Sequence, residues 1–164
     1  MNKTFAIGFG VGVVLLAIGV GMGVWDSKGN HLAPTGKIGK VRTLKVDDNA
    51  TIVVVDFHIR NDADVPMTVR TIEASIAVPG SGEGEGHLIA APDLEKVFRS
   101  YPELGEQYNP ALKARDQIAG HTVADRMVGI QFEAPQQSID SRSDLTLKVE
   151  DISGPVVTLH EKSK

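Results

Sequence analysis

The sequence contains no cysteine, which excludes disulfide bonds, thiolate metal sites, cysteine nucleophiles and the lipid-modified cysteine of a bacterial lipoprotein. It also has no strongly basic segment, because its lysines and arginines are spread singly among acids and the formal net charge is −4. A surface that binds phosphate normally shows as a basic patch, so we expect no nucleic-acid partner. A domain without disulfides depends on its hydrophobic core, and 164 residues suffice for one such domain.

One long uncharged run stands at the N-terminus. Residues 5–25 are apolar or glycine, and a helix of this length spans about 30 Å, which matches the hydrocarbon core of a bilayer. Trp25 would close the helix at a membrane interface. A cleaved signal peptide is the alternative, with Gly19-Val20-Gly21 as its cleavage site, but its apolar core normally has about 7–15 residues. We therefore predict an uncut signal-anchor over residues 1–25, followed by a polar linker over residues 26–36.

The orientation of this transmembrane helix depends on its flanking charges. Lys3 and the short N-terminus favour a cytoplasmic N-terminus, which places the C-terminal domain outside the cytoplasm, in the periplasm. Lysine and arginine also follow the run, which acts in the opposite sense, but large C-terminal domains cross a membrane largely irrespective of charge. We expect a single-pass membrane protein with an extracytoplasmic domain.

Glycine is patterned within the run. Gly8, Gly12, Gly19 and Gly23 fall on one face of the expected helix as two G-x-x-x-G units, a spacing that lets two helix backbones approach closely. Two interpretations stay open: the helix self-associates into a homo-oligomer, or glycine is simply common in membrane segments.

A series of short alternating segments follows the linker and predicts an all-β domain, an antiparallel β-sandwich over residues 37–164. We expect strands at residues 37–46, 51–60, 67–78, 123–132, 144–151 and 155–160. In the second segment Val53, Val55, Phe57 and Ile59 share one face, and Asp56, His58 and Arg60 share the other, which we expect to be solvated. In the third segment the apolar parity changes after Val69, which predicts a β-bulge near Arg70 and Thr71.

A long insert over residues 80–117 interrupts this series. The glycine-rich acidic stretch 79–86 is expected to be flexible. A helix is predicted over residues 92–101, because four apolar side chains there have the spacing i, i+3, i+4, i+7. Together with one further tyrosine they form a candidate interaction surface, composed of Leu94, Val97, Phe98, Tyr101 and Tyr108. The alternative is an insertion that plugs one open end of the sandwich.

The strand-turn-strand Phe57-His-Ile-Arg-Asn61 … Val65-Pro66-Met-Thr-Val69 resembles a motif of bacterial extracytoplasmic immunoglobulin-like domains, which are themselves distantly similar to the late-embryogenesis-abundant (water-stress) sandwich. Ile118-Ala-Gly120-His-Thr122 and Val128-Gly-Ile-Gln-Phe132-Glu-Ala-Pro135 are similar to a second motif of those domains, with Ala119 where proline is usual. The resemblance covers residues 40–160 and implies an immunoglobulin-like antiparallel sandwich. It implies no catalytic residues.

Residues that carry chemistry are few and scattered. Glu83, Glu85 and His87 offer metal-ligand atoms, but the stretch lacks the spaced ligands and closing glutamate of a calcium loop, so we expect a solvated loop. Asp56 and His58 resemble an acid–base pair, yet strand alternation explains them as a polar sheet face. We expect no catalytic residue, cofactor or metal.

The sequence therefore favours a non-catalytic module of the cell envelope, anchored in the membrane and binding a protein partner. Two alternatives stay open. In the first, the chain is an accessory subunit of a membrane enzyme or transporter. In the second, its sandwich binds a small ligand beneath the insert helix.

Overall fold

The computed structural model describes residues 32–80 and 82–162. The predicted anchor and its glycine stripe, Gly8, Gly12, Gly19 and Gly23, lie outside these residues. Within them no helix is both long and apolar enough to cross a membrane. The described part forms one compact unit that begins at Leu32.

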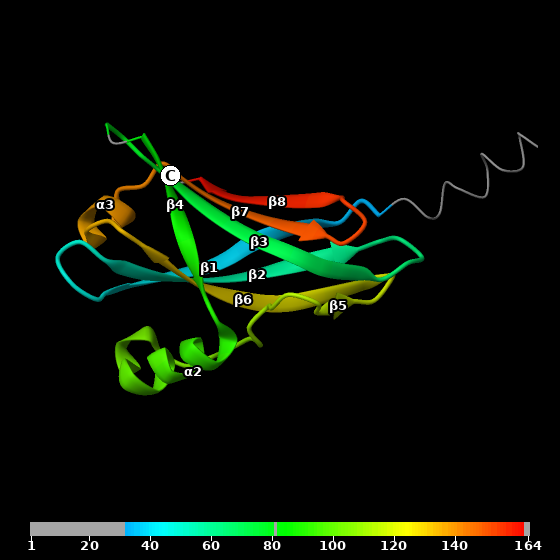
Figure 1. The fold of residues 1–164 in the computed structure, drawn as a ribbon, viewed down its shortest axis with the longest axis horizontal. Coiled ribbons are helices and arrows are strands. Elements are labelled where there is room, and N and C mark those ends of the chain that lie inside the picture. Colours follow the sequence, from blue (N-terminus) through cyan, green and yellow to red (C-terminus); the bar gives the residue numbers. More distant parts are fainter. Residues whose placement is uncertain (1–31, 81, 163–164) are drawn as a thin grey trace, which may run out of the picture. The chain divides into compact units, whose positions relative to one another are not determined.

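The unit is an antiparallel β-sandwich (Figure 1), which confirms the predicted all-β class. Its strands in chain order are β1 (Thr35–Lys45), β2 (Thr51–Asn61), β3 (Met67–Val78), β4 (Gly82–Ile89), β5 (Gln117–Ile118), β6 (Thr122–Phe132), β7 (Asp144–Asp151) and β8 (Val156–Lys162). The helices are α2 (Ala91–Ser100), the single 3₁₀ turn η1 (Pro102–Leu104) and α3 (Gln136–Asp140).

Two sheets share one strand. The first has the order β1-β2-β6-β4 and the second the order β4-β3-β7-β8. The first half of β4 pairs with β3, from Gly82 to Gly86, and the second half pairs with β6, from His87 to Ile89. This strand therefore crosses from one sheet to the other and closes that side of the sandwich, as Figure 1 shows.

The main core lies between the two sheets. The four residues assigned to the inner face of β2 are all buried there: Val53, Val55, Phe57 and Ile59. Residues predicted to face inward from β6 and β7, such as Phe132 and Leu147, join them. The register of β3 against β7 shifts between Val69 and Thr71, which confirms the predicted bulge. The bulge keeps the apolar residues on both sides of it turned towards the core.

The glycine-rich stretch was predicted to be flexible, and that prediction was wrong from Gly82 onwards, because the stretch forms β4. Its glycines are needed where the strand crosses the core. A Cβ on Gly86 would lie 2.3 Å from Cγ2 of Ile130 and 2.7 Å from the ring of Phe132. Only a residue without a side chain lets the backbone pass this close.

The rest of the insert lies on the outer face of the first sheet, not at an open end of the sandwich (Figure 1). Helix α2 matches the prediction to within one residue at each end. A second apolar cluster forms beneath it, composed of Leu44, Ile52, Val54, Leu94, Leu104 and Met127. The segment after η1 is joined to β6 by two hydrogen bonds: Leu112 N–H to the Met127 carbonyl at 2.8 Å, and Met127 N–H to the Pro110 carbonyl at 3.1 Å. The insert is thus a third layer.

Candidate functional site: the insert face

A buried ion pair fixes this third layer to the sheet. Arg42 of β1 and Asp56 of β2 lie on the outer sheet face, and their Nη2 and Oδ2 atoms are 2.6 Å apart. The Asp56 side chain was expected on a solvated face, and that expectation was wrong, because the insert covers it. His58 and Arg60, further along the same face, are half-buried and exposed, respectively.

Both partners of the pair also bind the insert. Arg42 Nη1 donates to the carbonyls of Leu104 and Glu106, each at 2.9 Å. The second Asp56 oxygen accepts a hydrogen bond of 2.9 Å from Asn109 Nδ2. Charged groups are retained in a protein interior only when they are paired and hydrogen-bonded. Here those hydrogen bonds tie the loop after η1 to two strands of the sheet.

Two aromatic rings extend this arrangement to the surface. The Arg42 guanidinium carbon lies 5.1 Å from the centre of the Phe98 ring and 5.4 Å from that of Tyr108. Lys40 Nζ lies 5.3 Å from the Tyr108 ring centre. These distances are typical of cation–π contacts. Tyr108 is nevertheless 60% exposed, so its ring is held in place while much of it faces solvent.

The five residues of the predicted interaction surface divide between interior and exterior. Leu94 is 1% exposed and packs onto the sheet, and Val97 and Phe98 are half-buried in the same cluster. Tyr101 and Tyr108 reach the surface. The interaction role of this set stays a prediction. Sequence reasoning missed Arg42 and Asn109; the available signal was that Arg42 and Asp56 point to the same side of strands that pair.

A shallow pocket of about 410 Å³ lies between α2 and the loop after η1. Its lining residues are Glu95, Phe98, Arg99, Gly105, Glu106 and Gln107. Phe98 is the one apolar side chain among them, whereas small-molecule sites are lined mostly by hydrophobic and aromatic side chains. This lining is not that of the apolar cavity beneath Phe98 that would favour a ligand-binding function.

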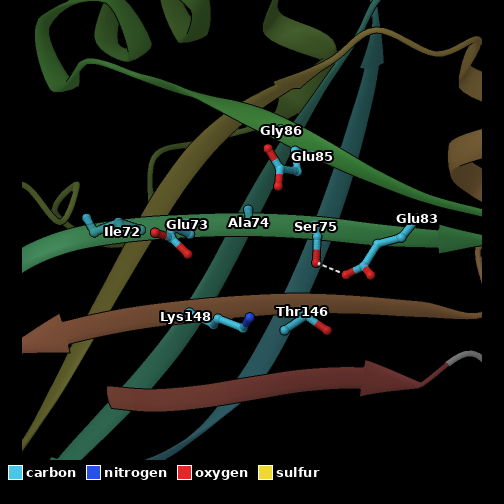
Figure 2. Close-up of a pocket in the computed structure, with 9 residues that line it drawn as sticks. All are labelled: Ile72, Glu73, Ala74, Ser75, Glu83, Glu85, Gly86, Thr146 and Lys148. Carbon is cyan, nitrogen blue, oxygen red and sulfur yellow. Dashed lines mark hydrogen bonds between the residues drawn. The ribbon is translucent and has the colours of Figure 1, made fainter. Parts of the chain in front are cut away.

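A second pocket, of about 510 Å³, lies on the outer face of the other sheet (Figure 2). The carboxylates of Glu73, Glu83 and Glu85 come from β3 and β4, and Lys148 comes from β7. Ser75 donates a 2.8 Å hydrogen bond to Glu83. None of the described residues that line the pocket is a histidine, the usual general base beside a serine nucleophile.

Two of the three residues considered as metal ligands, Glu83 and Glu85, line this second pocket, and His87 does not. His87 lies in the half of β4 that pairs with β6, opposite Gln131. Within residues 32–80 and 82–162 no three histidine, aspartate or glutamate side chains are grouped as a metal site requires.

One cluster on the outer face of β7 and β8 has the residue types of a catalytic triad. His160 Nδ1 lies 3.0 Å from Asp144 Oδ2 and 3.2 Å from Thr146 Oγ1. In a working triad the carboxylate and the hydroxyl bind different ring nitrogens, so that a proton can pass through the ring. Here both contacts fall on the same nitrogen, and the arrangement cannot activate the hydroxyl in that way.

Residues of the recognised motifs come together at the end of the sandwich where β1 begins. The amide of Asn61 is fully buried and donates to the carbonyls of Val65, Ile118 and Ala119 at 2.9, 3.1 and 3.3 Å. It joins the β2–β3 turn to the β5–β6 turn. A Cβ on Gly120 would lie 2.5 Å from the Ala63 carbonyl oxygen. These motif positions are therefore structural.

Asp151 performs a similar task at the same end. Burial of its carboxyl opposes ionisation, but hydrogen bonds from Ser153, Thr68 and Ile152 outweigh burial, and the pKa of Asp151 is lowered below its usual value. The hydrogen bond from the Thr68 N–H is 2.6 Å long. Asp151 thus connects the β7–β8 turn to the start of β3.

No family model matches the sequence, and no curated protein matches it. Among solved structures the chain is similar to the archaellum periplasmic stator protein FlaG from Sulfolobus acidocaldarius, with 9% identity, 79% of this chain and 100% of that chain covered, and a TM-score of 0.34. A protein from Archaeoglobus fulgidus is similar at 12% identity, with coverage of 77% and 98% and a TM-score of 0.41. An uncharacterized beta-sandwich protein from Clostridium difficile has 12% identity, coverage of 81% and 82%, and a TM-score of 0.32. At these TM-scores the matches support no argument about this chain.

Proposed function

We propose that the chain is a non-catalytic interaction module of the cell envelope, tethered to a membrane by residues 1–25 and binding a protein through the outer surface of its insert. The observation that carries this proposal is the way the insert is held. A buried ion pair and a second apolar cluster hold the insert on the sheet, while Tyr108 is kept exposed between two cations.

Exposed tyrosine beside arginine and lysine is suited to protein recognition. Tyrosine and arginine are enriched at the energetically important positions of protein interfaces. A side chain already held in place loses less conformational entropy when a partner binds. Tyr101 adds a second exposed ring on the same insert.

We assign the sandwich to the immunoglobulin-like type as part of the same proposal. In a constant-type immunoglobulin domain one sheet has the order A-B-E-D and the other C-F-G. The orders β1-β2-β6-β4 and β3-β7-β8 agree with this pattern when β4 is taken as strand D. The part of the insert that follows β4 then lies between strands D and E, where the chain adds a layer to the A-B-E face.

Site-specific photocrosslinking in native membranes tests the proposal. We would place a photoreactive phenylalanine analogue at Tyr108 of the full chain, with a matched probe at Thr158, which is exposed on β8 of the other sheet. The expected result is one defined protein adduct from position 108 and none from position 158. Equal labelling at both positions, or none at 108, would contradict a binding role for the insert.

The same membranes separate the alternatives. A stoichiometric adduct with a membrane enzyme or transporter would identify the accessory-subunit function, while a soluble or envelope partner supports the module. Carbonate washing tests the tether separately. A soluble mature form that begins near Met22 would show that residues 1–25 do not remain as an anchor.

A further inference from the structure

Three exposed apolar residues lie on strands or turns at the end of the sandwich where the described chain begins. Val123, Ile152 and Val156 are among the large hydrophobic residues that reach solvent, at 51%, 61% and 51% exposure. Thr35, the first residue of β1, pairs with Arg60 at the end of β2, and Arg60 in turn pairs with Val123. The β7–β8 turn lies at this same end (Figure 1).

The backbone N–H groups of the β7–β8 turn all have hydrogen-bond acceptors. Asp151 N–H donates to the Pro155 carbonyl, and Gly154 N–H to the Asp151 carbonyl, at 2.8 and 3.0 Å. Ile152 N–H donates to the Thr68 carbonyl at 3.0 Å, and Ser153 N–H to the Asp151 carboxylate at 2.7 Å. Pro155 has no N–H. Every N–H from 151 to 155 is thus accounted for, so the turn can enter a less polar medium without leaving a donor unpaired.

The length of the preceding chain limits how far this end can be from a membrane. Nine residues, 26–34, separate the uncharged run from β1. Fully extended, they span at most about 30 Å. A tether of at most this length would let the β1 end of the sandwich reach the bilayer surface.

We infer that the tip of the β7–β8 hairpin, defined by Ile152 and Val156, is a lipid-contacting element that rests in the interfacial region of the bilayer. This inference depends on the proposed tether. We expect this contact to be apolar in origin, because the tip itself presents Ile152 and Val156. Two arginines at this end lie in ion pairs: Arg60 is 3.7 Å from Asp62 and Arg70 is 3.3 Å from Glu150. The contact should therefore not require anionic headgroups.

The absence of cysteine makes the test direct, because a single introduced thiol can be labelled. The full chain is reconstituted in zwitterionic phosphatidylcholine vesicles with an environment-sensitive fluorophore on Ile152→Cys or Val156→Cys. The matched control is Asn49→Cys, exposed in the β1–β2 turn at the opposite end. We expect blue-shifted emission and quenching by nitroxide-labelled lipid at 152 and 156, neither of them at 49, and no dependence on added anionic lipid.

A second pair of variants guards against disturbance by the label. With the reporter at 156, Ile152→Asp should abolish the quenching, while Val46→Asp, at another exposed apolar position near the opposite end, should leave it unchanged. Water-like emission at 152 and 156 in vesicles that retain the chain would overturn the lipid contact and leave the tether standing. Equal quenching at all three positions, or quenching that requires anionic lipid, would also overturn it. Loss of the chain from carbonate-washed vesicles would instead remove the tether, and this inference with it.

Discussion

Arg42 and Asp56 form an ion pair, 2.6 Å between Nη2 and Oδ2, on a sheet face that a simple sandwich would leave in water. Both side chains are less than 10% exposed, because the insert covers them. The insert supplies three of their other hydrogen-bond partners, Leu104, Glu106 and Asn109. The stability of the sheet and the position of the insert are therefore linked through one pair of charges.

Removing one member of this pair should be costly. Asp56→Ala would leave the Arg42 charge buried without its partner, and breaking a buried pair typically costs about 3–5 kcal/mol. Urea unfolding of residues 32–164 measures the loss. The matched control is Arg60→Ala, which breaks the exposed contact with Asp62 and should change the free energy of unfolding by less than about 1 kcal/mol. Similar losses for the two variants would mean that the insert does not bury Asp56.

The packing of α2 on the sheet can be tested with two substitutions at their contact, one that adds a methyl group and one that shortens a side chain. A Cβ on Gly129 would lie 2.5 Å from Leu94 Cδ1. We expect Gly129→Ala to destabilise residues 32–164 by about 1–3 kcal/mol through overpacking, and Leu94→Ala by about 2–5 kcal/mol through the cavity it leaves. In the double variant the added methyl no longer meets the leucine, so the measured loss should be smaller than the sum. Strict additivity in urea unfolding would contradict this contact.

The residues that sequence analysis placed correctly depend on local pattern. The phase of β2, the bulge of β3 and the helix α2 each follow from neighbouring side chains whose spacing decides which face they occupy. Asp56 was placed wrongly because its burial depends on Asn109 and the rest of the insert, more than forty residues further along the chain. No periodicity within β2 contains that information.

The glycine-rich stretch is a second segment whose structure the sequence pattern did not predict. Its composition is that of a flexible linker, and the structure makes it a strand because β4 must pass close to the Ile130 and Phe132 side chains. The requirement for glycine comes from atoms of β6, which sequence spacing does not reveal. The contacts of Lys40 and Arg42 with the Tyr108 ring are likewise between residues far apart in the chain.

The phase of β2 gives a direct stability test. Phe57 is 3% exposed in the main core, so Phe57→Ala should cost about 3–5 kcal/mol. His58, its neighbour on the opposite face, is half-buried and away from the main core, so His58→Ala should change the free energy of unfolding by about 0.5 kcal/mol or less. Equal losses in urea unfolding would show that the strand phase is wrong.

Two glycines of β4 allow a matched test of whether this strand crosses the core. Gly86→Ala would bring a Cβ within 2.3 Å of Ile130 Cγ2, whereas a Cβ on Gly84 meets its nearest neighbour, Ile76 Cγ1, at an ordinary 3.7 Å. We expect Gly86→Ala to lower the free energy of unfolding by about 1–3 kcal/mol. Gly84→Ala should stay within about 1 kcal/mol of the parent, since alanine also restricts the unfolded chain. A strand that tolerated both alanines equally would not cross the core in this way.

The stability of the domain should depend on pH through Asp151. The pKa of this carboxyl is lowered in the folded state, because the hydrogen bonds from Ser153, Thr68 and Ile152 outweigh the opposing effect of burial. A folded pKa below the unfolded value of 3.8 means that the carboxylate stabilises the fold fully above that value. The contribution is lost as the pH falls through the folded pKa.

Asp151→Asn isolates this contribution, since asparagine does not titrate and turns an amide towards backbone donors. We expect a loss of about 1.5–3 kcal/mol at neutral pH, the usual range for hydrogen bonds to a charged group. The difference between parent and variant should shrink as the pH is lowered below 3.8. Urea unfolding of residues 32–164 across this range measures it, with Asp125→Asn as the control on an exposed carboxyl of β6. A difference that stayed constant down to the lowest pH at which the parent folds would mean that the charge of Asp151 does not hold the β7–β8 turn to β3.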